Sequence, residues 1–142
     1  MPNRTLVIRL EPRIDAVPDM LDRLEAYAGE AKIPPKTAYR LAVVCEELAV
    51  NVAMHGTGGE HGATYVEIKI RQDGDHRLHL SVEDDGRPFD PLAHAAPDIS
   101  AELDEREAGG LGIHFVRTLV QEIAYERDGG RNRLTAALDP VE

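Results

Sequence analysis

The spacing of apolar residues predicts one short strand and two helices in the first part of the chain. Residues 6–10, four of which are apolar, are predicted to form a short strand that ends before Glu11-Pro12. Apolar residues then recur at helical spacing through residues 15–31, with Pro18 acceptable in a first helical turn. Ile33-Pro34-Pro35 interrupts this pattern, and a second helix is expected from there to the glycine at position 56.

The rest of the chain alternates between predicted hairpins and one more helix. Strand patterns flank two tight-turn signals, Asp73-Gly74 and Asp128-Gly129-Gly130, and a helix follows a glycine-rich entry. These elements are expected at residues 65–71, 78–82, 109–120, 123–127 and 133–138. Between them, residues 87–108 form a long segment rich in Pro, Asp, Glu and Ala, which is either a lid or a solvated excursion with a helical turn near 99–103.

This order of elements predicts an α+β fold. Hairpins dominate, and helices do not alternate with every strand, so we expect a two-layer sandwich with helices on one face of a mixed, mostly antiparallel sheet. With 142 residues and no sign of a boundary or repeat, the chain is expected to form a single domain over 1–142.

The second helix carries a polar row beside an apolar face. Glu47, Asn51 and His55 are spaced four apart and therefore lie one above the other. The adjacent apolar face consists of Leu41, Cys45, Leu48 and Val52. At about 100° per residue, Glu47 is expected at the margin of the core and Glu46 toward solvent. The alternative is an ordinary amphipathic helix with solvated polar residues.

Composition narrows the possible partners and compartments. The net charge of -10 would repel a nucleic-acid backbone, so direct binding of DNA or RNA is not expected. The single cysteine excludes an internal disulfide, and no apolar run is long enough to span a membrane. We therefore expect a cytoplasmic protein without a membrane segment.

Three short motifs suggest nucleotide chemistry. Asp84-x-Gly86 ends a strand, where a carboxylate can accept a hydrogen bond from an exocyclic amine such as that of adenine. Gly110-x-Gly112 opens a helix whose free N–H groups suit a phosphate. Asn51 offers a neutral oxygen ligand for Mg²⁺, and Glu47 is placed to act as a general base. Taken singly, each motif is equally explained by turn, helix-entry or surface chemistry.

Together and in this order, these motifs resemble the GHKL-type ATP-binding domain of gyrase, the Hsp90 chaperone, histidine kinases and MutL. Among these, the chain is most similar to the stand-alone anti-sigma-factor serine/threonine kinases. The similarity is carried by residues 46–56, 82–91, which include Phe89-Asp90-Pro91, and 109–116.

The resemblance implies a histidine-kinase-like ATPase fold that binds ATP and Mg²⁺. It implies that Asn51 coordinates magnesium, that Glu47 activates the attacking hydroxyl and that Asp84 binds the adenine amine. It further implies that the nucleotide is approached by Gly86, Gly110, Leu111 and Gly112. A nucleotide lid is expected at about 92–108, with Arg106 near the position of a lid arginine.

The chain departs from the family pattern in two places. Gly130-Arg131-Asn132 replaces the Gly-Thr of the last hairpin, so a nucleotide contact there is doubtful. The lid is also acidic, which opposes triphosphate binding unless a basic partner is present, through Asp98, Glu102, Asp104, Glu105 and Glu107. A metal site formed by His55, Glu60 and His61 is less favoured than a capping or packing role for His55.

The leading functional hypothesis is a kinase that transfers the ATP γ-phosphate to a serine or threonine of an anti-anti-sigma (STAS-type) partner and also binds a sigma factor. The resemblance suggests a homodimer. The alternative is an ATP-gated protein-binding module with little or no transfer. A detached histidine-kinase catalytic domain is a third possibility, less favoured because no long helix pair with an acceptor histidine precedes the first strand in this sequence.

Overall fold

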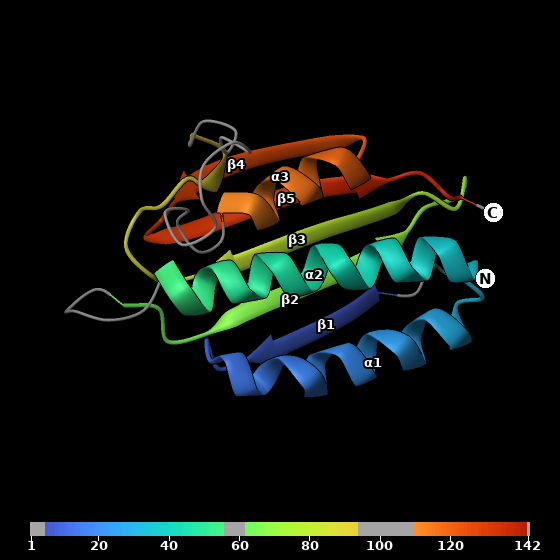
Figure 1. Cartoon of the computed structure of the whole chain (residues 1–142), viewed down its shortest axis with the longest axis horizontal. Coiled ribbons are helices and arrows are strands. Elements are labelled where there is room, and N and C mark those ends of the chain that lie inside the picture. The colour runs from blue at the N-terminus through green and yellow to red at the C-terminus, as the bar shows by residue number, and fades with distance from the viewer. Residues whose placement is uncertain (1–4, 56–61, 94–109, 142) are drawn as a thin grey trace.

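A computed structural model describes residues 5–55, 62–93 and 110–141 as a five-stranded sheet with three α-helices (Figure 1). The strands form the order β1-β2-β3-β5-β4, and every described pairing is antiparallel. In chain order the elements are β1 (Thr5–Leu10), η1 (Ile14–Ala16), α1 (Val17–Glu30), α2 (Pro35–His55), β2 (Val66–Gln72), β3 (Leu78–Asp84), η2 (Pro91–Ala93), α3 (Gly110–Leu119), β4 (Glu122–Asp128) and β5 (Arg131–Leu138).

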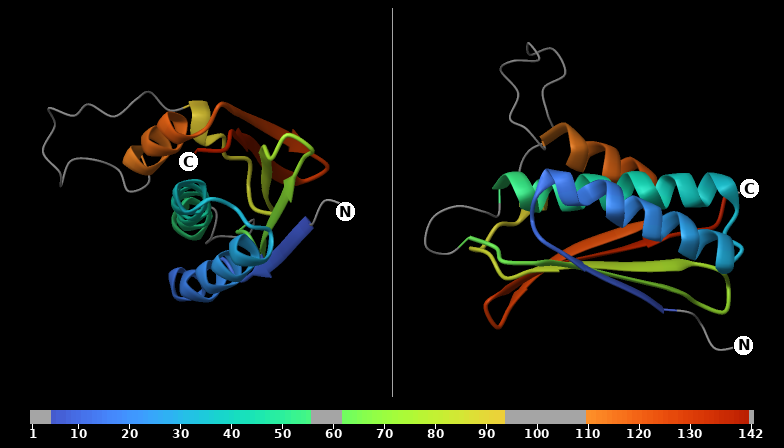
Figure 2. Two further views of the ribbon diagram at one scale, coloured as in Figure 1. Left: turned by 90° about the vertical axis from the view of Figure 1, so that its right-hand side faces the viewer. Right: turned by 90° about the horizontal axis from the view of Figure 1, so that it is seen from below.

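All three helices cover one face of the sheet, as the two side views show (Figure 2). The α+β, two-layer fold is thereby confirmed, and the sheet is more regular than the expected mixed one because its adjacent strands run in opposite directions throughout the described residues. The core lies between the layers, where these side chains are at most 2% exposed: Ile8, Leu24, Leu41, Val44, Ile68, Leu80, Val116 and Leu138.

One element boundary agrees with the sequence prediction, and another differs from it in a way that matters for the site. The α2 helix begins at Pro35, because proline suits the first helical position, where its missing N–H is not needed. Strand β3 extends to Asp84, whereas the pattern predicted an end at residue 82. The extension follows from pairing on both sides, since Asp84 lies opposite Val66 on β2 and Asn132 on β5.

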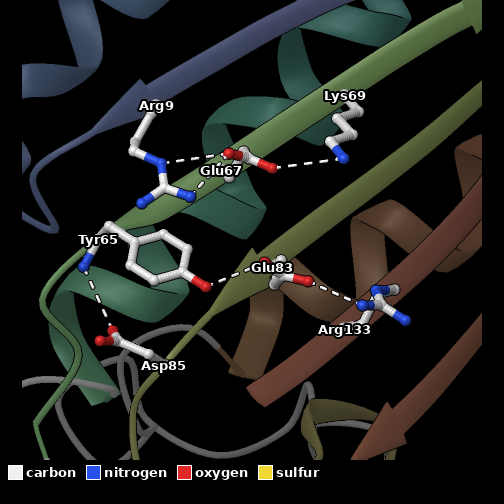
Figure 3. Close-up of polar contacts among 7 residues, drawn as sticks. All are labelled: Arg9, Tyr65, Glu67, Lys69, Glu83, Asp85 and Arg133. Carbon is white, nitrogen blue, oxygen red and sulfur yellow. Dashed lines mark hydrogen bonds and ion pairs between the residues drawn. The ribbon is translucent and has the colours of Figure 1, made fainter. Parts of the chain in front are cut away.

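The face of the sheet without helices carries a ladder of charged residues in register across the strands (Figure 3). Glu67 and Glu83 are directly opposite each other, an arrangement that repels unless cations flank it. Arg9 contacts Glu67 at 2.9 Å, and Arg133 contacts Glu83 at 2.8 Å. Tyr65 donates its hydroxyl hydrogen bond to Glu83, and Arg9 lies 4.0 Å from the centre of its ring. The two arginines therefore offset the repulsion between the Glu67 and Glu83 carboxylates.

The last described residues are tied to the start of α2 by one buried threonine. Thr37 is 1% exposed, and its Oγ1 donates to the Val141 carbonyl at 2.8 Å while accepting from the Val141 N–H at 2.7 Å. We expect Thr37→Val to lower the free energy of unfolding by about 1–3 kcal/mol, because both backbone groups lose their partner. Chemical denaturation measures this loss. Thr135→Val, at an exposed position, is the matched control and is expected to change stability by less than about 0.5 kcal/mol.

Candidate functional site

The polar row of α2 has the orientation that its spacing predicted. Asn51 is only 6% exposed, Glu47 is partly buried and Glu46 is exposed. Neither Glu47 nor the Asn51 side chain has a hydrogen-bond partner among the described residues. Cys45 on the adjacent face is fully buried, and burial raises the pKa of its thiol to about 12, so it serves as an inert core residue. Through Glu47 and Asn51 the row therefore presents one carboxylate and one amide that no other described side chain engages.

Asp84 is held in a fixed orientation at the end of β3. Its side chain is 6% exposed, and its Oδ1 accepts from the Gly86 N–H at 2.9 Å and from Asn132 Nδ2 at 3.0 Å. The other oxygen, Oδ2, has no partner among the described residues. A nearly buried carboxylate with one oxygen occupied and one free is suited to accept a hydrogen bond from a ligand N–H.

Asp84 and Asn51 line one apolar pocket between α2 and the sheet. Its walls are formed by Leu48, Val52, Val82, Phe89, Pro91, Tyr125 and Leu134, and Asn132 completes it. The Phe89 ring stacks on His55 with centroids 5.4 Å apart. The enclosed water-accessible space is about 40 Å³, so a nucleotide base requires outward movement of one wall. Apolar walls with a few polar groups among them suit a flat aromatic ring that carries an amine.

The start of α3 lies directly against Glu47. A Cβ atom added at Gly112 would overlap Glu47 Oε2, so the two residues meet without room for a side chain. Because α3 begins at Gly110, Gly112 belongs to its first turn, whose N–H groups form the positive end of the helix. The structure thus brings Glu47 against Gly112, the second glycine of the Gly110-x-Gly112 helix entry, and Asn51 lies one turn further along α2.

This contact makes Gly112 a sensitive position. We expect Gly112→Ala to lower the turnover of the reaction that Glu47 serves by about tenfold, because the new methyl group displaces the carboxylate by an ångström or so. Steady-state kinetics check this, with Gly74→Ala as the matched control, since a Cβ at Gly74 meets nothing within 4 Å. Normal turnover in Gly112→Ala would show that the position of Glu47 is unimportant.

Burial perturbs both carboxylates of the site in the same direction. The pKa of Glu47 is raised, first by burial and then by the charge of neighbouring Glu46. The pKa of Asp84 is also raised, mainly by burial, although hydrogen bonds from Asn132 and Gly86 oppose the rise. Carboxyl pKa values raised by burial are typical of functional sites.

The residues present fit a magnesium ion that is bound together with phosphates. Mg²⁺ prefers oxygen ligands and keeps several of its waters, so one protein ligand and phosphate oxygens suffice. The buried Asn51 amide, which has no partner among the described residues, supplies such an oxygen. The described residues contain no cluster of three or more His, Cys, Asp or Glu side chains that could hold a metal by themselves.

Several expectations concern residues outside the described ranges. The expected lid at about 92–108 lies outside them except for its first two residues, which end the short helix η2 (Pro91–Ala93). The other expectations of this kind concern Arg106, the acidic residues of the lid, the helical turn near 99–103, and the pair Glu60 and His61. The backbone of Gly110 and Leu111 belongs to α3, and nothing is assigned to the Leu111 side chain.

The sequence analysis did not identify the roles of three residues in or beside the pocket: Tyr125, Arg127 and Asn132. The sequence predicted only that a nucleotide contact at Asn132 is doubtful, and the structure shows that its side chain bonds directly to Asp84. Tyr125 donates to Asn132 Oδ1, and Arg127 donates to the Gly86 carbonyl at 2.7 Å. A usable signal was present, because a hairpin that turns at Gly129-Gly130 places Arg127 opposite Asn132.

Comparison with known proteins agrees with this geometry. A family model described as a histidine kinase-like ATPase domain matches residues 10–138. The chain is 25% identical over 135 residues to the serine/threonine-protein kinase BtrW of Bordetella bronchiseptica, covering 95% of this chain and 94% of that one. It is 29% identical over 97 residues to the serine-protein kinase RsbW of Bacillus pumilus, covering 63% of this chain and 58% of that relative.

Solved structures show the same fold. The RsbU and RsbW domains of Rv1364c from Mycobacterium tuberculosis superpose with a TM-score of 0.69 at 17% identity, covering 98% of this chain and 33% of that chain. The SiaB–SiaC complex of Pseudomonas aeruginosa gives a TM-score of 0.61 at 16% identity, covering 94% of this chain and 88% of the matched chain. No helix in the described part of the chain is long and apolar enough to cross a membrane.

Proposed function

Because the match over residues 10–138 places this chain in the family of histidine kinase-like ATPase domains, we propose that it is an ATP-dependent serine/threonine-protein kinase. The observation that carries the proposal is the contact of Glu47 with Gly112, one helical turn from Asn51, which lines the same pocket as Asp84. Two relatives named as serine or serine/threonine kinases support the reaction type.

In this proposal each residue has a defined task. Asp84 accepts the adenine amine through Oδ2, and the apolar walls of the pocket hold the ring. Asn51 supplies the protein ligand to Mg²⁺, which neutralises charge on the phosphates when bound. The N–H groups at the start of α3 face the phosphates, and Gly112 leaves room for the Glu47 carboxylate beside them. Gly86 completes the turn that orients Asp84.

Glu47 is the proposed catalytic base. It accepts the proton of the acceptor hydroxyl while the oxygen attacks the γ-phosphorus, and the bond from that phosphorus to the β-γ bridging oxygen breaks. Its position at the margin between α2 and α3, partly buried and without a partner among the described residues, suits this task. Burial raises the pKa of Glu47, which strengthens it as a base.

The proposed acceptor is an anti-anti-sigma protein of the STAS type, and the proposed client is a sigma factor. The support is the similarity to RsbW and BtrW, together with a structural neighbour crystallised in complex with a second protein. We also propose that the chain acts as a homodimer.

The test is transfer of labelled phosphate. The purified chain is mixed with labelled ATP, magnesium and small proteins encoded beside it, and label on a partner serine or threonine is expected. Asn51→Ala should abolish transfer, whereas Thr135→Ala, exposed on the sheet, should leave it unchanged. Tight ATP binding without transfer to any of these proteins would support an ATP-gated binding module instead.

The raised pKa of Glu47, to which Glu46 contributes, leads us to expect that turnover depends on pH. A base acts in its ionised form, so turnover should fall as pH drops through the raised pKa of Glu47. Glu46→Gln removes one of the two causes of the rise, and the acidic limb of the pH–turnover curve should therefore move to lower pH. An unchanged limb in this variant would mean that Glu47 does not control it.

A further inference from the structure

Asn132 is the most connected polar side chain of the pocket. It is 6% exposed on β5, between the ends of β3 and β4, where it lies opposite both Asp84 and Arg127. Its Nδ2 donates to Asp84 Oδ1 at 3.0 Å and to the Arg87 carbonyl at 2.8 Å. Its Oδ1 accepts from three donors: the Phe89 N–H at 3.2 Å, Arg127 Nη1 at 3.2 Å and the Tyr125 hydroxyl.

These contacts use the whole amide group. Both hydrogens of Nδ2 are donated, and Oδ1 already accepts three bonds, so Asn132 has no donor left for a ligand. The assignment of oxygen and nitrogen is determined by the neighbours, because the partners of Nδ2 are acceptors and those of Oδ1 are donors. Asn132 therefore acts on a ligand through other residues.

We propose that Asn132 is a positioning residue, which holds Asp84 with Oδ2 free and thereby sets a preference for 6-amino over 6-oxo purine nucleotides. The inference rests on the proposed function, because it assumes that this pocket receives the base of ATP. With Oδ1 engaged by Asn132 and the Gly86 N–H, the carboxylate offers the ligand an acceptor. A 6-amino group donates to that acceptor, whereas a 6-oxo group is repelled by it.

Loss of Asn132 changes the charge state of Asp84 as well as its orientation. Burial raises the pKa of Asp84, and the hydrogen bond from Asn132 is the foremost influence that lowers it, followed by the bond from the Gly86 N–H. Nearby charges act in both directions, since Asp85 raises this pKa and Arg127 lowers it. Without Asn132 a larger fraction of Asp84 is protonated, and a protonated carboxyl donates to a 6-oxo group.

The experiment compares ATP with inosine triphosphate. Calorimetric titration of Asn132→Ala should show about tenfold weaker ATP binding, a smaller loss for inosine triphosphate, and ATP binding whose acidic limit lies at higher pH. Asn132→Thr suits a strand and keeps one hydroxyl donor, so it should partly restore the preference even if Asn132→Ala folds poorly. Thr135→Ala, exposed on the same strand, should match the unsubstituted chain.

Failure of the proposed function and failure of the positioning role give different results. An unsubstituted chain that does not bind ATP overturns the proposed function. A chain that binds ATP, and whose Asn132 variants keep the same ATP-to-inosine-triphosphate ratio and the same pH dependence, overturns only the positioning role. A uniform loss of affinity for both nucleotides in a folded Asn132→Thr variant also overturns it, because that is the result of a purely structural defect.

Discussion

Glu47→Gln is expected to lower phosphate transfer by a factor of about 10² to 10⁴ while ATP still binds. The glutamine has nearly the same size and can lie against Gly112 as the carboxylate does, but it cannot accept the proton of the acceptor hydroxyl. Binding of the adenine ring depends on the pocket around Asp84, which Glu47 does not line. Single-turnover transfer from labelled ATP, together with calorimetric ATP binding, separates the two effects.

The adjacent glutamate provides the matched control for this substitution. Glu46→Gln makes the same chemical change one residue earlier, on an exposed side of α2. It is expected to retain transfer apart from the shift in pH dependence, since its carboxylate faces solvent. Full transfer in Glu47→Gln would refute the general-base role, and loss of ATP binding in that variant would point instead to a structural defect.

Asp84→Asn is expected to weaken ATP binding by about 10- to 100-fold, the range for losing one hydrogen bond to a charged group. An amide at this position replaces a ligand-facing oxygen by an NH₂ group, or loses the bond from Asn132, depending on its orientation. Asp85→Asn is the control, because that carboxylate binds Thr64 and Tyr65 instead of lining the pocket. Equal affinities for ATP in both variants would exclude Asp84 as the base contact.

The substitution Asp84→Asn should not lower the stability of the nucleotide-free protein. Burial raises the pKa of Asp84 in the folded state, so the folded state binds the proton more tightly than the unfolded state does. Stability therefore decreases as pH rises from the ordinary pKa of an aspartate through the raised one. An asparagine has no such titration, and thermal unfolding of Asp84→Asn at neutral pH should occur at or above the temperature of the unsubstituted chain. A binding residue of this kind trades stability for function.

The local elements of this protein are encoded by short-range patterns. Helical spacing identified α2 and the orientation of Glu47 and Asn51, because side chains four residues apart share a helix face regardless of what packs on them. Alternation and turn residues identified the hairpins β2–β3 and β4–β5, since a tight turn pairs its own flanking strands. The resemblance in the three motifs then supplied the expected roles.

Tertiary structure decided which of these elements touch. The insertion of β5 between β3 and β4 brings Asn132 against Asp84, two residues far apart in the chain, and extends β3 to include that aspartate. Packing of α3 on α2 brings Gly112 against Glu47. Both contacts depend on the order of strands and the placement of helices across long sequence separations, which periodicity does not report because it concerns only near neighbours. The sequence alone therefore indicated the candidate side chains, and the fold determined how each is oriented and what surrounds it.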